Sequence, residues 1–147
     1  MTRLLLLIPS TSYRVSDFVK AAHRLGVDVT VGSNERQVLE SINKGGTVTI
    51  DFSNPDSAII EIEEFHTSFP IIAIVGVDDT TAIIAAKASQ KLGFKYSSPK
   101  AVMATGNKLL LRHALSTSDL SSTKYNTIGL NDDPRKFSRK IDFPCVL

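Results

Sequence analysis

The stretch Ile71-Ile72-Ala73-Ile74-Val75-Gly76-Val77-Asp78-Asp79 decides the fold, because it joins an apolar strand to an acidic turn. A continuous apolar run such as residues 71–75 is typical of a strand that is buried on both faces of a parallel sheet. The Ala- and Ile-rich segment that follows, residues 79–92, predicts a helix that ends at Gly93. This order of strand, turn and helix is that of an α/β domain.

Three more strand signals precede this stretch, and a helix signal follows each of them. The predicted strands are residues 3–8, 27–31 and 47–50. The intervening helices are predicted to begin at the capping residues Ser16, Asn34 and Asn54. Four strands that alternate with three helices, joined by right-handed crossovers, predict an α/β fold with a parallel, doubly wound sheet. Such sheets bind ligands beyond the carboxyl ends of the strands, where the winding direction reverses.

Basic and acidic residues are unevenly distributed along the chain. Residues 1–74 carry six basic and nine acidic side chains, whereas residues 75–147 carry eleven and six. No Asp or Glu occurs from residue 80 to residue 118, where the cations are Lys87, Lys91, Lys95, Lys100, Lys108 and Arg112. This basic segment predicts either an anion site, with phosphate as the favoured ligand, or a basic helix face in contact with solvent. The net charge of only +2 gives no support to nucleic-acid binding.

Lys108 occupies an unusual position for a cation. Asn107 is predicted to cap a helix that runs from residue 108 to about residue 115, so Lys108 lies in the first turn. A positive charge there opposes the helix dipole by roughly 0.3–1 kcal/mol unless an anion compensates it. Arg112 lies four residues later on the same helix face and adds to the repulsion. The two residues therefore either share an anion or extend separately into water.

Missing motifs exclude or disfavour several classes of protein. No G-x-G-x-x-G follows the first strand, which disfavours a dehydrogenase-type dinucleotide site. The absence of G-x-x-x-x-G-K-[ST] and of G-x-S-x-G removes the P-loop and hydrolase hypotheses. Cys145 is the only cysteine, so no intrachain disulfide forms, and the three histidines lack the spacing of metal ligands. The apolar run at residues 4–8 is too short for a signal peptide or a membrane span, so we expect a cytoplasmic location.

The C-terminal part of the chain begins with a Ser/Thr-rich segment, residues 116–123, which predicts a linker. We therefore divide the sequence into a domain of residues 1–115 and a second segment of residues 116–147. The elements expected in the second segment are a strand at residues 125–128, a helix starting near Pro134 and a strand at residues 143–147. The last of these strands is apolar and runs to the end of the sequence, which predicts that the natural chain continues.

Several short motifs follow one another in a recognisable order. The acidic pair Asp78-Asp79 follows the fourth strand, and Leu92-Gly93 precedes the helix start Ser98-Pro99-Lys100-Ala101-Val102. Asn107-Lys108 then opens the next helix, and the tail is Phe143-Pro144-Cys145-Val146-Leu147. In this order and spacing the motifs resemble the ATP-grasp superfamily, in its carboxylate–amine ligase and biotin-carboxylase-like branches. The resemblance spans essentially the whole chain and implies a Rossmann-like (pre-ATP-grasp) domain followed by the start of an ATP-grasp domain.

The resemblance implies ATP-dependent ligation, in which ATP phosphorylates a carboxylate and an amine or similar nucleophile attacks the acyl phosphate. ATP and Mg²⁺ are the implied cofactors, with Mg²⁺ bridging the phosphates. Lys108 matches the first of two family lysines that contact the ATP phosphates. The second lysine, the glycine-rich flap and the Mg²⁺ ligands of the family fall beyond residue 147. We therefore assign no catalytic residue and no metal ligand in this chain, and we expect the chain alone to be inactive.

Substrate contacts in this family often come from loops at the carboxyl edge of the sheet. This makes Ser10, Thr11, Ser12 and Arg14 candidate substrate-binding residues. Their hydroxyl groups are also typical of residues that only form a turn, and both interpretations stay open. The implied partners are a small-molecule carboxylate and a nucleophile, without nucleic acid or membrane, and a homodimer is one assembly that the sequence permits.

Two non-enzymatic hypotheses stand beside the ligase. The first is a receiver-like signalling module, because Asp51 ends the third strand, where a receiver domain carries its phospho-accepting aspartate. A receiver domain also needs an acidic pair after its first strand to hold Mg²⁺, and residues 9–11 are Pro-Ser-Thr. The second hypothesis is a non-catalytic α/β module that binds an anionic effector.

Overall fold

The structure, a computed structural model, describes residues 3–36, 45–138 and 141–145. The chain divides into two compact units, Met1–Met103 and Ala104–Leu147. Helix α4 (Pro99–Thr105) runs across this division. The domain boundary expected near residue 116 stays a prediction.

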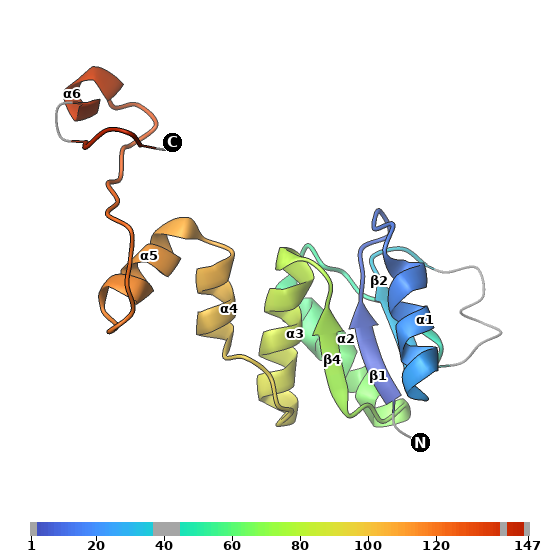
Figure 1. The fold of residues 1–147 in the computed structure, drawn as a ribbon. Coiled ribbons are helices and arrows are strands. Elements are labelled where there is room, and N and C mark those ends of the chain that lie inside the picture. The colour runs from blue at the N-terminus through green and yellow to red at the C-terminus, as the bar shows by residue number, and fades with distance from the viewer. Residues whose placement is uncertain (1–2, 37–44, 139–140, 146–147) are drawn as a thin grey trace. The chain divides into compact units, whose positions relative to one another are not determined.

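The first unit is built on a four-stranded parallel sheet (Figure 1). Its strands are β1 (Arg3–Leu7), β2 (Asp28–Ser33), β3 (Thr47–Thr49) and β4 (Ala73–Gly76). The spatial order is β3-β2-β1-β4, and every neighbouring pair is parallel. The chain therefore winds from β1 to β3 on one side and then places β4 on the other side of β1. The winding direction reverses between β1 and β4.

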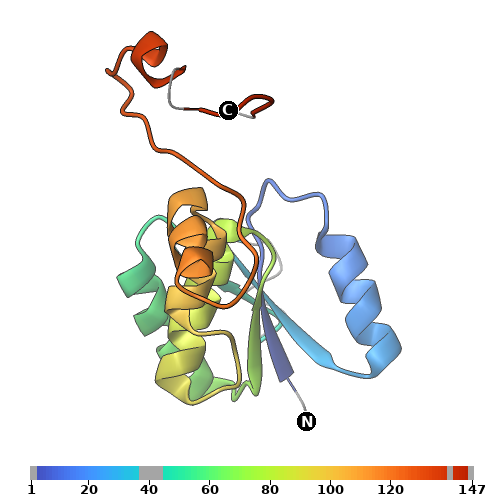
Figure 2. The ribbon, with the colours of Figure 1, turned by 60° about the vertical axis from the view of Figure 1, so that its left-hand side comes forward.

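Helices cover both faces of this sheet (Figures 1 and 2). They are α1 (Val15–Leu25), α2 (Pro55–Ser68) and α3 (Asp79–Leu92). Helix α1 lies on one face, and α2 and α3 pack against each other on the opposite face. Because helices on opposite faces connect parallel strands, the sheet is doubly wound. The predicted α/β fold is confirmed.

The main hydrophobic core lies between the sheet and the layer formed by α2 and α3. Strand β1 is apolar, and its alternate residues Leu5 and Leu7 are fully buried in this core. The buried members of the core are Leu5, Leu7, Ile50, Phe52, Ala58, Ile62, Phe65, Ile71, Ile74, Ile84, Ala85 and Ala88. All of them come from the first unit, so this unit has a hydrophobic core of its own.

The start of α2 follows the predicted capping pattern. Asn54 Oδ1 accepts a hydrogen bond from the Ser57 N–H at 3.2 Å. Pro55 occupies the first helical position, where its missing N–H costs no helical hydrogen bond. The capping side chain therefore satisfies one of the backbone donors that a helix start leaves free.

The start of α1 differs from the prediction. The helix begins at Val15, after Arg14, and no side chain caps it. The predicted cap at Ser16 is therefore wrong, because Ser16 already lies inside the first turn and cannot act as the residue that precedes the helix. Residues 35 and 36, directly after the predicted cap Asn34, are not helical, and Asn34 Oδ1 accepts a hydrogen bond from the Ser10 N–H instead. The rest of this predicted helix, residues 37–44, lies outside the described residues.

The second unit contains α5 (Lys108–Ser116) and α6 (Pro134–Ser138) among its described residues. Both helices begin where the sequence predicts. The strands predicted at residues 125–128 and 143–147 are wrong as far as the structure describes them, because residues 125–128 and 143–145 form no strand. A strand needs a hydrogen-bonded neighbour, and the described part of this unit contains no other strand.

No helix in residues 3–36, 45–138 and 141–145 is long and apolar enough to cross a bilayer.

Candidate ligand-binding site

A pocket of about 300 Å³ lies beyond the carboxyl ends of β1 and β4, where the winding direction of the sheet reverses. Its lining residues are Pro9, Thr11, Ser12, Tyr13, Arg14, Val77 and Asp78. One wall follows β1 and the other follows β4, so both walls belong to the first unit. This is the position at which parallel α/β sheets bind small molecules. We call it the switch-point pocket.

The wall after β1 is a glycine-free turn that hydrogen bonds hold in place. The Ser12 N–H donates to the Pro9 carbonyl at 2.9 Å, and the Arg14 N–H donates to Ser12 Oγ at 3.3 Å. The Ser10 N–H donates at 2.8 Å to Oδ1 of Asn34, a residue that follows β2. The turn is therefore tied to the neighbouring strand, and the Ser12 hydroxyl accepts a hydrogen bond within the turn.

The wall after β4 is fixed by the start of α3. Asp78 Oδ1 accepts hydrogen bonds from the Thr81 N–H at 2.8 Å and from the Thr81 hydroxyl at 2.7 Å. Thr81 Oγ1 accepts in turn from the N–H groups of Val77 and Asp78, at 3.0 and 3.1 Å. These bonds form a capping box around a fully buried threonine. The wall is therefore held by several hydrogen bonds that act together.

Gly76 allows β4 to end directly against the first turn of α3. A Cβ atom built on Gly76 would overlap backbone atoms of Thr81 and Ala82. Backbone atoms cannot move aside as the end of a flexible side chain can, so the close approach requires glycine. Gly76 thereby determines how near α3 lies to the pocket.

Arg14 and Asp78 bring opposite charges to the pocket without forming an ion pair. Arg14 is exposed, its guanidinium carbon lies 5.8 Å from the centre of the Tyr13 ring, and it has no acidic partner among the described residues. Asp78 uses Oδ1 in the capping box, whereas its Oδ2 has no hydrogen-bond partner in the described part of the chain. The pocket therefore offers a ligand one guanidinium group and one carboxylate oxygen.

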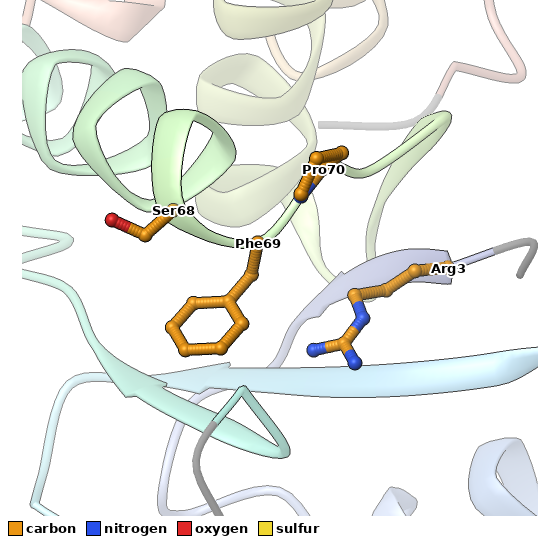
Figure 3. A pocket seen from close by; sticks show the side chains of 4 residues that line it. All are labelled: Arg3, Ser68, Phe69 and Pro70. Carbon is orange, nitrogen blue, oxygen red and sulfur yellow. The ribbon is translucent and has the colours of Figure 1, made fainter.

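A second pocket of about 300 Å³ lies at the amino end of β1 and is lined by Arg3, Ser68, Phe69 and Pro70 (Figure 3). Figure 3 shows the Arg3 guanidinium and the Phe69 ring extending toward the same space, and 5.6 Å separates the guanidinium carbon from the ring centre. Arg3 also donates a hydrogen bond to the Gly45 carbonyl. Because this cation already has a ring and a carbonyl as partners, we assign it a structural role.

Asp51, on which the receiver-like hypothesis rests, is a turn residue. Its Oδ1 accepts hydrogen bonds from the Ser53 hydroxyl at 2.6 Å and from the Ser53 N–H at 2.9 Å. These bonds stabilise the carboxylate and hold the pKa of Asp51 below that of an ordinary aspartate. Within the residues that the structure describes, no group of three or more His, Cys, Asp or Glu side chains could hold a metal ion. The local turn therefore accounts for the position of Asp51.

Two cations of the basic segment form ion pairs with α2. Lys87 Nζ lies 3.6 Å from Asp56 Oδ1, and Lys91 Nζ lies 2.6 Å from Glu63 Oε2. These two lysines on α3 thus contact acidic residues of the neighbouring helix. Their side chains are 36% and 54% exposed, so both ion pairs lie on a solvent-accessible helix face, and neither lysine lines the switch-point pocket.

Lys108, the predicted ATP contact, is exposed in the first turn of α5 in the second unit. Asn107 Oδ1 accepts hydrogen bonds from the N–H groups of Leu109 and Leu110, at 3.0 and 3.1 Å, so these backbone donors are already used. Arg112, on the same helix, forms no ion pair with any described residue. An anion at this helix would therefore be bound by the side chains of Lys108 and Arg112.

Three of the four candidate substrate-binding residues, Thr11, Ser12 and Arg14, line the same pocket. The fourth, Ser10, contributes its backbone N–H to Asn34. Sequence reasoning gave Asp78 no role in binding, although Asp78 also lines the pocket. The signal that could have identified it is its position after β4, which the strand order places beside β1.

The fold and the pocket define the class of this protein as a parallel α/β domain with a small-molecule pocket at its switch point. The family model described as the ATP-grasp N-terminal domain matches residues 19–94, just over half of the chain. The chain therefore belongs to the ATP-grasp N-terminal domain family, and the resemblance seen in its sequence motifs is confirmed. A comparison of the chain with curated proteins gave no match.

Two solved structures have a similar fold. The crystal structure of an L-amino acid ligase from Bacillus licheniformis matches with a TM-score of 0.68 and 18% identity, over 83% of this chain and 30% of the ligase. That of a phosphoribosylglycinamide synthetase from Anaerococcus prevotii matches with a TM-score of 0.60 and 21% identity, over 78% of this chain and 28% of the synthetase. At 18% and 21% sequence identity, the comparison shows a similar fold and nothing more specific. The chain spans less than a third of the length of either protein.

Proposed function

We propose that this chain is the N-terminal part of an ATP-grasp ligase that activates a carboxylate as an acyl phosphate for attack by an amine or similar nucleophile. Membership of the ATP-grasp N-terminal domain family supports ATP-dependent chemistry. The two solved structures of similar fold are named as a ligase and a synthetase, which agrees with this reaction class. The observation that carries the proposal is the switch-point pocket with its unpaired arginine, because it offers a carboxylate a binding site in such a domain.

We assign Thr11, Ser12 and Arg14 to the binding of a small-molecule substrate. The Arg14 guanidinium can form charge-assisted hydrogen bonds with a carboxylate, and the two hydroxyl groups can add directional hydrogen bonds. Ser10 acts through its backbone, because its N–H bond to Asn34 fixes the turn that carries the other three residues.

We assign Lys108 to the ATP phosphates. Its exposed ammonium group, four residues from the unpaired Arg112, fits the negative charge of a phosphate. ATP would supply the phosphoryl group that activates the carboxylate, with Mg²⁺ bound to its phosphates. Under this proposal residues 116–147 are the first elements of the ATP-grasp domain, and the Mg²⁺ ligands come from a segment beyond this chain. A cytoplasmic location and assembly as a homodimer belong to the same proposal.

The test is ATP turnover by the intact gene product, measured as ADP release in the presence of small carboxylates and amines. We expect ADP release to require both a carboxylate and a nucleophile. Lys108→Met should lower the rate by about tenfold or more, which corresponds to a loss of about 1.4 kcal/mol of transition-state stabilisation. Lys95→Met, at an exposed lysine of the same basic segment, is the matched control and should leave the rate unchanged. ADP release that no carboxylate stimulates would contradict the proposal.

The alternative is a non-catalytic α/β module that binds an anionic effector. The unpaired Arg14 is the observation in its favour, because a guanidinium group binds a phosphate or carboxylate effector as readily as a substrate. An intact gene product that binds small anions without releasing ADP would support this alternative. A receiver-like module would in addition accept a phosphoryl group on Asp51. Asp51→Asn would abolish this phosphorylation.

A further inference from the structure

We propose that the pocket at the amino end of β1 is a second ligand site, which binds a small aromatic carboxylate. Arg3, Ser68, Phe69 and Pro70 line this pocket, and we call it the amino-end pocket (Figure 3). None of these lining residues lines the switch-point pocket, which follows the carboxyl ends of β1 and β4. The inference therefore does not rest on the proposed function, because a ligand here lies away from the proposed substrate site.

The structural role of Arg3 uses only one of its guanidinium nitrogens. Nη1 donates a hydrogen bond to the Gly45 carbonyl and a second one, at 3.4 Å, to Thr30 Oγ1. The remaining N–H groups, on Nε and Nη2, have no hydrogen-bond acceptor among the described residues. Nε and Nη2 lie along one edge of the planar guanidinium, and such an edge binds both oxygens of a carboxylate. Because Nη1 is already held, this edge is preorganised for a ligand.

The Phe69 ring gives the amino-end pocket a rigid apolar wall. It stacks on the ring of Phe65, with 5.2 Å between the ring centres, and Phe65 belongs to the hydrophobic core. The Arg3 guanidinium carbon lies 5.6 Å from the centre of the Phe69 ring, and both groups extend toward the same space (Figure 3). Pro70 adds a second apolar side chain. A ligand with a flat apolar group can therefore pack against this wall while its carboxylate contacts Arg3.

The charges around the amino-end pocket require the carboxylate to contact Arg3 directly. Arg3 forms no ion pair with any acidic residue in the described part of the chain, and this includes Asp28, its register partner on β2. Phe69 directly follows α2, so the pocket lies at the carbonyl end of that helix, which disfavours a nearby anion. A charge-assisted contact of two oxygens with the guanidinium outweighs this effect, because such bonds are among the strongest that a carboxylate forms.

The combination of a cation and an apolar wall selects the class of ligand. An inorganic anion would leave the Phe69 ring and Pro70 in contact with water, whereas a neutral aromatic molecule would cover the Arg3 N–H groups without offering an acceptor. An aromatic carboxylate satisfies both parts of the pocket at once. A volume of about 300 Å³ is small for a ligand pocket and suits one ring with one carboxylate group.

The test is a ¹H–¹⁵N NMR titration of the 147-residue chain with benzoate as the probe. We expect benzoate to shift the amide signals of Arg3, Gly45 and residues 68–72. Benzamide keeps the ring without the charge, and acetate keeps the charge without the ring. Each of these two compounds should bind about tenfold more weakly than benzoate, or worse.

Variants of the two main residues test the contact that each one makes. Arg3→Lys keeps a positive charge and a donor for Gly45, but it loses the edge with two nitrogens and should weaken benzoate binding about tenfold. Phe69→Leu keeps an apolar side chain without the flat ring, so the affinity for benzoate should fall toward that for acetate. The matched controls, Arg24→Lys and Phe143→Leu, change exposed residues outside the pocket and should leave the affinity unchanged.

Three results would overturn the amino-end site. They are binding of benzamide as tight as that of benzoate, unchanged benzoate affinity in both Arg3→Lys and Phe69→Leu, and no shift of the signals of residues 68–72 at roughly 10 mM benzoate. The comparison of the three compounds uses the wild-type chain, so it decides the question even where a variant fails to fold. None of these results depends on ADP release by the intact gene product, so the amino-end site and the ligase proposal can each fail while the other stands.

Discussion

Gly76 is the residue at which β4, α3 and the wall of the switch-point pocket meet. A methyl group at this position would collide with the backbone of Thr81 and Ala82, so either α3 or the end of β4 would have to move. We expect Gly76→Ala to lower the free energy of unfolding by about 1–3 kcal/mol, the usual cost of overpacking a well-packed site. Urea denaturation of the two proteins, followed by circular dichroism, measures the difference.

The control for this substitution is Gly93→Ala at the end of α3. Gly93 has φ of 74°, a left-handed conformation, but no atom lies within 4 Å of the added Cβ. Gly93→Ala should therefore lower the free energy of unfolding only by the cost of placing alanine in this backbone conformation, about 1 kcal/mol. A smaller loss at Gly76 than at Gly93 would show that α3 moves away from β4 without difficulty, and the close approach would then lose its importance for the pocket.

The carboxyl group of Asp51 provides a prediction about pH. Ser53 donates its hydroxyl and its N–H to this carboxylate, and the pKa of Asp51 is lowered as a result. A carboxyl group whose pKa is lower in the folded protein stabilises the fold above its unfolded pKa, and the stabilisation is lost as the pH falls through the folded pKa. Ser53→Ala removes the hydroxyl donor and should raise the pKa of Asp51 toward its ordinary value. NMR titration of the side-chain carboxyl carbon measures this shift, and an unchanged pKa would show that the Ser53 N–H alone is responsible.

At the scale of helices and strands, the sequence predicts those elements whose signals are local. Helix α3 follows its predicted bounds of residues 79–92, because an apolar period, a cap and a terminal glycine all lie within one segment. The strand expected at residues 125–128 does not form, because a strand depends on a neighbour that its own residues do not specify. The residues of the candidate site likewise differ in whether their own segment of sequence identifies them. Arg14 could be predicted from the loop that carries it, whereas Asp78 requires the strand order as well, because that order places the end of β4 beside the end of β1.

The turn after β1 depends on β2 through the hydrogen bond from the Ser10 N–H to Asn34 Oδ1. Asn34→Ala should free this N–H and speed its amide hydrogen exchange by about fivefold, as expected when one hydrogen bond of about 1 kcal/mol is lost. Asn34→Asp keeps a side-chain acceptor and should keep the slow exchange. Equal exchange rates in the wild-type protein and Asn34→Ala would mean that other contacts hold the turn.

At the scale of the whole molecule, the chain separates into a unit with a hydrophobic core and a unit whose described residues form no comparable core. The buried members of the core cluster all belong to the first unit, whereas α5 and α6 contribute no buried residue. Burial of apolar surface is the main source of folding free energy, so the first unit should carry most of the stability of the chain.

We therefore expect a chain of residues 1–106 to unfold in one cooperative transition, with a midpoint close to that of the 147-residue chain. Ile62→Ala, which opens a cavity among fully buried residues, should destabilise both chains equally, by about 2–5 kcal/mol. Calorimetry of the four proteins measures the transitions. If the shortened chain lost its cooperative transition, or if Ile62→Ala affected the two chains differently, the second unit would have to contribute to the core.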